Sequence, residues 1–155
     1  MTRDELERAI DAAFADARMP RTEAELTSGG IDGPYVVKHF LGRSRADVET
    51  GRFMPSLHME DFTYMTPEAV AYYLPVVLRF MLAKPSDDEL WIFLSAFLRG
   101  ITGTYADRSL TSLSVAQRTA IADCVDYLAE QWQNDEWRAK EAKKAAKLAR
   151  RYRET

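Results

Sequence analysis

The chain has 155 residues, enough for one domain with a sizeable core, and its 46% hydrophobic and 29% charged residues are typical of a globular protein. A single cysteine, Cys124, excludes an internal disulfide and a cysteine metal site, and its apolar neighbours predict a buried thiol. The net charge of −3 is uneven, because residues 138–155 hold eight basic and two acidic side chains, a net +6, which leaves −9 on residues 1–137.

The start of the chain predicts one clear helix. Thr2 and Glu5 have the spacing of a capping box, and apolar residues then recur at helical spacing as far as Phe14. Pro20 ends this pattern. The segment is acidic where a signal peptide would need a basic start and an apolar run.

The next part of the chain is harder to interpret. Residues 21–33 are polar and rich in glycine, and they predict a loop. Pro34 opens a short apolar run that predicts a short helix over residues 35–41. Residues 43–65 are interrupted by glycine and proline, and we expect them to form an extended segment laid across the core.

A strong helix start follows at Thr66-Pro67-Glu68, which combines a capping hydroxyl, a proline in the first turn and an acid near the positive end of the helix. The helix it opens is apolar almost all round and should be central in the fold. Pro75 lies inside it and should kink it. Its apolar run is well short of the roughly 20 residues that cross a membrane, so we expect a cytoplasmic protein with no membrane partner.

Two further helices complete the expected body. The first spans residues 90–101 and is closed by Gly100 and Gly103. The second begins at Ser114, which has Gln117 at capping-box spacing. Its packed face carries four apolar residues at helical spacing, namely Ile121, Val125, Leu128 and Trp132.

Beyond Asn134 the apolar pattern weakens. Residues 139–149 offer mainly alanines, with Leu148 the only large apolar side chain, so this stretch should be helical but weakly attached, and deletion of residues 139–155 should cost almost no stability. We therefore predict an all-α fold, an irregular bundle of four main helices and one short helix with a long basic C-terminal helix. Its two parts are an acidic body, residues 1–134, and a basic extension, residues 135–155.

The best candidate for metal or acid–base chemistry is a short run with one histidine and two carboxylates, His58, Glu60 and Asp61. In an extended segment His58 and Glu60 would share a face while Asp61 points away. His39 could join them only through tertiary folding. Because two histidines without HxxxH or HExxH spacing are a weak signal, a solvated loop is the favoured interpretation, and a small metal-dependent enzyme is an alternative.

No other motif predicts catalysis or a cofactor. Gly29-Gly30 and the glycines at 100 and 103 lack the lysine and the strand context of phosphate loops. Tyr72 is adjacent to Tyr73, and because their directions on a helix diverge by about 100° they predict core packing with bonded hydroxyls rather than a pocket. We predict no catalytic residue, no cofactor and no metal.

The basic extension has two interpretations, a passive solvated helix or a binding arm. As an arm it could follow phosphates and stack bases on Trp137 and Tyr152, but the acidic body disfavours nucleic acid. Docking onto an acidic surface, either the chain's own body or a second copy of the chain, is equally plausible. The candidate binding residues are Trp137, Arg138, Lys143, Lys144, Lys147, Arg150 and Arg151.

Residues 62–75, FTYMTPEAVAYYLP, resemble a family of small uncharacterised bacterial proteins that share a phrase like FLTPEAxxYYLPAxL. The acidic first helix and the short helix before Gly42 fit the same pattern, so the resemblance covers roughly residues 3–130. Tyr64-Met65 stands where the family usually has a leucine pair, and the basic extension is an elaboration. Because the family has no established activity, the resemblance implies no catalytic residues.

These features favour a non-enzymatic protein-interaction module of a bacterial cytoplasm, whose acidic α-helical body binds another bacterial protein. A toxin-neutralising immunity-type protein is one concrete form, because an acidic surface speeds capture of a basic toxin. The first alternative is a nucleic-acid-associated regulator that acts through residues 137–153. The second is the small metal-dependent enzyme around His58, Glu60 and Asp61.

Overall fold

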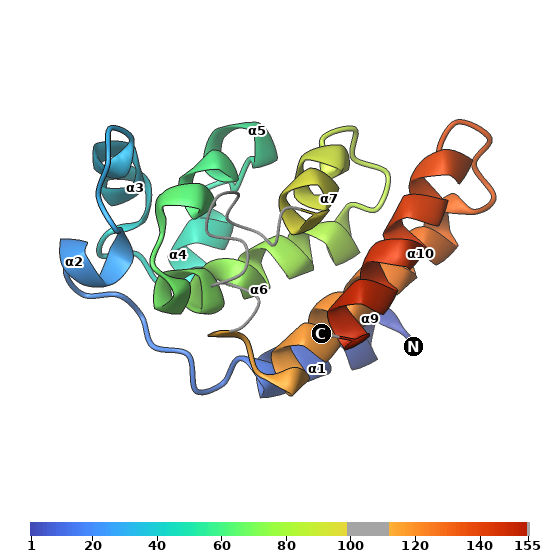
Figure 1. The fold of residues 1–155 in the computed structure, drawn as a ribbon, viewed down its shortest axis with the longest axis horizontal. Helices are drawn as coiled ribbons and strands as arrows, with labels where there is room; N and C mark the ends of the chain where they lie inside the picture. The colour runs from blue at the N-terminus through green and yellow to red at the C-terminus, as the bar shows by residue number, and fades with distance from the viewer. Residues whose placement is uncertain (99–111, 155) are drawn as a thin grey trace.

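The computed structural model describes the backbone of residues 1–98 and 112–154, with all their side chains except those of residues 97 and 98 (Figure 1). Within these residues the chain is helical, and the only β-type pairing is a bridge between Thr27 and Met65, so the predicted all-α fold is confirmed. The helices are α1 (Arg3–Ala13), α2 (Glu23–Leu26), α3 (Gly33–Phe40), α4 (Arg45–Thr50), α5 (Pro55–His58), the 3₁₀-helix η1 (Glu60–Tyr64), α6 (Pro67–Ala83), α7 (Leu90–Leu98), α9 (Val115–Trp132) and α10 (Ala139–Glu154).

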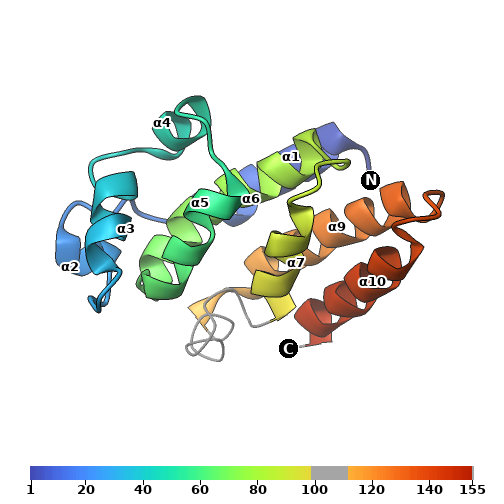
Figure 2. The same cartoon turned by 90° about the horizontal axis from the view of Figure 1, so that it is seen from above.

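Helix α6 occupies the middle of the molecule, between α2 and α3 at one end and α9 and α10 at the other (Figures 1 and 2). The Thr66 hydroxyl caps it by accepting the N–H of Ala69 at 3.1 Å, and Pro67 occupies its first turn. The helix continues through Pro75, as the sequence predicts. Its buried side chains are Ala69, Val70, Tyr73, Leu74, Pro75, Val76, Val77, Leu78, Met81 and Leu82.

The adjacent tyrosines of α6 pack as predicted. The Tyr73 ring is fully buried, and its hydroxyl donates to the carbonyl of Phe40 at 3.0 Å. The hydroxyl of Tyr72 accepts the N–H of Arg45 at 3.3 Å. Both residues therefore fix α3 and α4 onto α6 rather than opening a pocket.

Helices α1 and α9 cover α6 and complete the main core. The predicted capping boxes are present at Thr2 and Ser114. The predicted face of α9 is also confirmed, since Ile121, Val125 and Leu128 are fully buried. The expected end of the preceding helix at Gly100 and Gly103 lies outside the described residues.

The prediction that residues 21–33 and 43–65 contain no helix is wrong. Helix α2 lies within the expected loop, and α4, α5 and η1 replace the expected extended segment. Each of these helices has six residues or fewer, so none shows the repeated apolar spacing by which a longer helix is recognised. No helix in the described ranges is both long and apolar enough to span a membrane.

The expectation of a weakly attached C-terminal helix is also wrong. Helices α9 and α10 lie side by side along their length (Figure 2), and α10 buries Leu148 and Tyr152 almost completely. The other buried side chains of this face are alanines, which allow the two helix backbones to approach closely. The buried residues of α10 are Ala142, Ala145, Leu148, Ala149 and Tyr152.

Candidate functional site

The two faces of α10 differ completely in character. One face packs on α9, and the opposite face is cationic and exposed to solvent. The cations recur at helical spacing over the twelve residues 140–151, which corresponds to about 16 Å of helix. This basic stripe consists of Lys140, Lys143, Lys144, Lys147, Arg150 and Arg151.

Arg138 fixes the start of α10 to the body. Its guanidinium donates to the carbonyls of Pro85 at 3.1 Å and Ser86 at 2.8 Å, and it lies 3.0 Å from the carboxylate of Asp88. The Trp132 ring lies 5.5 Å from the same guanidinium, and its Nε1 donates to Pro85 at 2.6 Å. Arg138 is therefore engaged within the chain, although the sequence placed it among the candidate binding residues.

The other candidate binding residues are exposed, either on α10 or just before its first turn. Trp137 is 92% exposed beside the first turn of α10. Lys144 lies 3.1 Å from Glu141 on the same helix, so part of its charge is compensated. Lys143, Lys147, Arg150 and Arg151 all belong to the exposed stripe. Lys140 completes it.

A groove of about 520 Å³ runs beside the stripe, between α9 and α10. Its floor consists of small apolar side chains, and its rims carry charges of opposite sign, with Asp126 and Glu130 on α9 and Lys143 on α10. The lining residues of this α9–α10 groove are Asp126, Ala129, Glu130, Gln133, Ala139, Ala142, Lys143 and Ala146.

The histidines and the acid of the middle segment form a second cluster. Nδ1 of His39, on α3, lies 2.6 Å from Oδ2 of Asp61, in η1, and only 7% of the Asp61 side chain is exposed. Burial raises the pKa of Asp61, while the hydrogen bond with His39 acts to lower it. Tertiary folding thus brings His39 to Asp61, which the sequence left open.

The expected solvated loop around His58 is wrong, because this residue is only 8% exposed. Its Nδ1 accepts the N–H of Met54 at 3.0 Å, and its ring lies 5.3 Å from that of His39 and stacks on Phe53 at 5.4 Å. Burial lowers the pKa of His58, so the ring is held neutral. Glu60 is exposed instead of joining the cluster.

This arrangement orients one imidazole against one carboxylate, as an acid–base pair requires. Within residues 1–98 and 112–154, however, no three His, Cys, Asp or Glu side chains are grouped closely enough to hold a metal ion. His58 is engaged with the backbone and with aromatic rings. The cluster therefore has a clear structural role in joining α3, α5 and η1.

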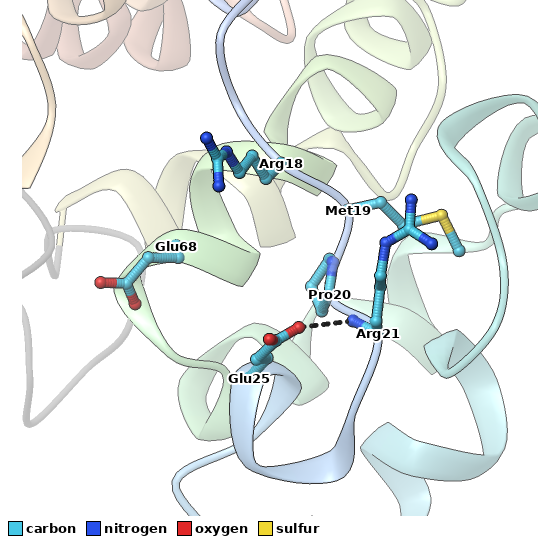
Figure 3. A pocket seen from close by; sticks show the side chains of 6 residues that line it. All are labelled: Arg18, Met19, Pro20, Arg21, Glu25 and Glu68. Atoms are coloured by element: carbon cyan, nitrogen blue, oxygen red, sulfur yellow. Dashed lines mark hydrogen bonds between the residues drawn. The ribbon is translucent and has the colours of Figure 1, made fainter.

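A surface pocket of about 660 Å³ lies where the connection between α1 and α2 passes the start of α6 (Figure 3). Arg18 and Glu68 lie on one side of it, while Glu25 accepts the N–H of Arg21 at 2.8 Å on the other. Two arginines and two glutamates balance its charge, and all four are exposed. Among its described lining residues only Met19 and Pro20 are apolar, whereas small-molecule sites are lined mostly by apolar side chains.

We compared the sequence with protein-family models and with curated proteins, and the structure with solved structures, and none of the three comparisons gives a significant match. The resemblance of residues 62–75 to a bacterial family therefore stays a prediction. The function has to be inferred from the surfaces of the molecule.

Proposed function

We propose that this chain is a non-enzymatic protein-interaction module of a bacterial cytoplasm, and that it binds an acidic segment of a partner protein along α10. The observation that supports this proposal is the docking of α10. One face of the helix is fixed on α9 by Leu148 and Tyr152, and the opposite face presents the basic stripe. A solvated extension with no role would not need such a fixed orientation.

The fixed orientation favours binding in two ways. Because α10 is already ordered on the body, a partner does not have to supply the free energy of ordering it. Six cations on one face also attract an acidic partner and orient it during the encounter. Both effects increase the affinity of a surface whose individual ion pairs are weak.

The α9–α10 groove favours a protein over a nucleic acid as the partner. Asp126 is paired with Arg153. Glu130, however, lines the groove beside Lys143 with no ion pair among the described residues, so phosphates placed along the stripe would also meet a carboxylate. A protein segment can instead place apolar side chains on the alanine floor and pair with charges of both signs. Such mixed surfaces are typical of protein–protein contacts.

A narrower form of the proposal is an immunity-type protein that neutralises a basic toxin. In that form the acidic residues 1–137 would provide the contact surface, and the basic stripe would not contact the toxin. Charge reversal along the stripe separates the two forms, because it weakens binding of an acidic partner and leaves binding of a basic toxin unchanged or improved.

The stripe and the exposed Trp137 favour nucleic acid as a second candidate partner. Fluorescence anisotropy with a labelled DNA duplex tests it. We expect no measurable binding at about 150 mM salt, where the Debye length is about 8 Å. An affinity that falls about a thousandfold between roughly 50 and 200 mM salt, and that disappears in the Lys143→Glu/Lys147→Glu variant, would replace the proposal with the nucleic-acid alternative. Arg8→Glu/Lys38→Glu is the matched control.

A further inference from the structure

A second surface, away from α10, has the features of a small-molecule site. It is a groove of about 630 Å³ between α1, the turn after α4 and the last turns of α6. Its volume lies within the usual range of about 300–1,000 Å³ for such sites. Its apolar wall includes Phe53, Val76 and Phe80. The proposed protein interaction does not use any of these elements.

The wall of this groove is a preformed aromatic cluster. The Phe53 ring stacks on Phe93 with centroids 5.9 Å apart and an interplanar angle of 10°, and it meets Phe80 edge-on at 5.8 Å. Phe80 in turn meets Phe93 edge-on at 5.5 Å. Because these rings hold one another in place, a ligand would find a fixed apolar surface.

The charges around the groove leave a positive excess. Its two acids are already paired, Glu7 with Arg3 at 2.8 Å and Glu49 with Arg79 at 3.2 Å. Two further cations, Arg52 and Lys84, line the same groove and are exposed, and no ion pair joins either to a carboxylate of residues 1–98 or 112–154. Lys84 Nζ lies 5.1 Å from the centroid of the Phe80 ring, so a cation stands at the edge of the apolar wall.

Arg52 also occupies an unfavourable backbone position. Its φ is +63°, in the left-handed region where the residue after a helix is usually glycine. Gly51 stands one position earlier, where a Cβ would lie 2.9 Å from the carbonyl oxygen of Asp47. An arginine at position 52 costs about 1 kcal/mol relative to glycine, and the fold gains no ion pair from it among the described residues.

We propose that this groove binds a small amphipathic organic anion. The aromatic or aliphatic body of the ligand lies on Phe53, Val76 and Phe80, and its anionic head lies with Arg52 and Lys84. The acids on the rim repel the head less than free carboxylates would, because Glu7 is paired with Arg3 and Glu49 shares Arg79 with Asp11. Metal ions and neutral apolar compounds do not fit this combination of wall and charge.

The test uses two fluorescent probes with the same aromatic skeleton, the anion 8-anilinonaphthalene-1-sulfonate and the neutral N-phenyl-1-naphthylamine, which lacks the sulfonate. We expect saturable binding of the anion to the native protein, at least about tenfold tighter than binding of the neutral probe. The Arg52→Gly/Lys84→Gln variant should lose at least about tenfold in affinity for the anion and keep its affinity for the neutral probe. Arg8→Gln/Lys38→Gln, which removes two exposed cations elsewhere, should change neither.

The Arg52→Gly substitution also separates binding from folding. Because glycine is favoured at a positive φ, this variant should unfold at the same or a higher urea concentration than the wild type while it binds the anion more weakly. The proposal is overturned if the wild type shows no saturable binding of the anion. It is also overturned if both probes bind equally, or if the anion binds the Arg52→Gly/Lys84→Gln variant as tightly as the wild type.

Discussion

The guanidinium of Arg153 lies 2.6 Å from the carboxylate of Asp126, and this contact joins the last turn of α10 to the middle of α9. A second contact of 2.6 Å joins the same guanidinium to Asp123. These ion pairs are partly exposed, so each contributes at most about 1 kcal/mol. These ion pairs help to orient α10 on α9, whereas burial of the apolar face of α10 supplies most of the free energy that holds the helix there.

The attachment of α10 predicts a large effect of Tyr152→Ala. The Tyr152 ring is fully buried, and removing a buried aromatic ring from a core costs about 3–5 kcal/mol. Urea unfolding followed by circular dichroism measures this change in the free energy of unfolding. Lys147→Ala, on the exposed face of the same helix, should change it by less than about 0.5 kcal/mol. A loss below about 1 kcal/mol for Tyr152→Ala would mean that α10 is not docked.

The long helices could be predicted from the sequence because their signals are local. Thr66 with Pro67, and Ser114 with Gln117, mark helix starts through residues within one turn of each other. The docking of α10 could not be predicted in this way. Alanines bury little area each, and their value lies in how closely two helices approach, which depends on the partner helix.

The buried His58 predicts a loss of stability in mild acid. Because burial lowers its pKa below 6.5, the unfolded chain takes up the proton first as the pH falls through about 6.5, and the free energy of unfolding decreases. Asp61 acts in the opposite sense, since burial raises its pKa above 3.8 and the folded state takes up that proton first.

His58→Asn isolates the histidine contribution. The asparagine oxygen can accept the N–H of Met54 as Nδ1 does, but it does not titrate. We expect about 1–3 kcal/mol lower stability at pH 7, from the lost stacking on Phe53, and a shallower decrease between about pH 7 and 5. Urea unfolding across this range is the measurement. Equal slopes in the variant and the wild type would show that His58 is not held neutral by burial.

Cys124 should be almost unreactive in the folded protein. It is fully buried on α9, and burial raises its pKa to about 12, so the reactive thiolate is scarce near pH 8. An aromatic disulfide reagent should modify the native protein at least about a hundredfold more slowly than the guanidinium-unfolded protein. Equal rates in the two states would place Cys124 at the surface and contradict the packing of α9.

The candidate sites depended on tertiary contacts that the sequence does not reveal. His39 and Asp61 are 22 residues apart and meet only because α3 packs on η1. In the sequence Arg138 cannot be distinguished from the cations of the stripe. In the structure its guanidinium donates hydrogen bonds to the carbonyls of Pro85 and Ser86. The basic composition of the segment and the helical spacing of its cations are visible in the sequence, whereas the packing of the opposite face on α9 is not.

The most direct test of the proposed protein interaction is photo-crosslinking in living cells from a benzoylphenylalanine placed at position 147, in the middle of the stripe. We expect a covalent adduct with one acidic protein that resists nuclease treatment. This adduct should be lost when Lys143→Glu and Arg150→Glu are added, and it should not form from position 38 on α3, an exposed lysine at the other end of the molecule. A nuclease-sensitive adduct, or equal labelling from positions 147 and 38, would contradict it.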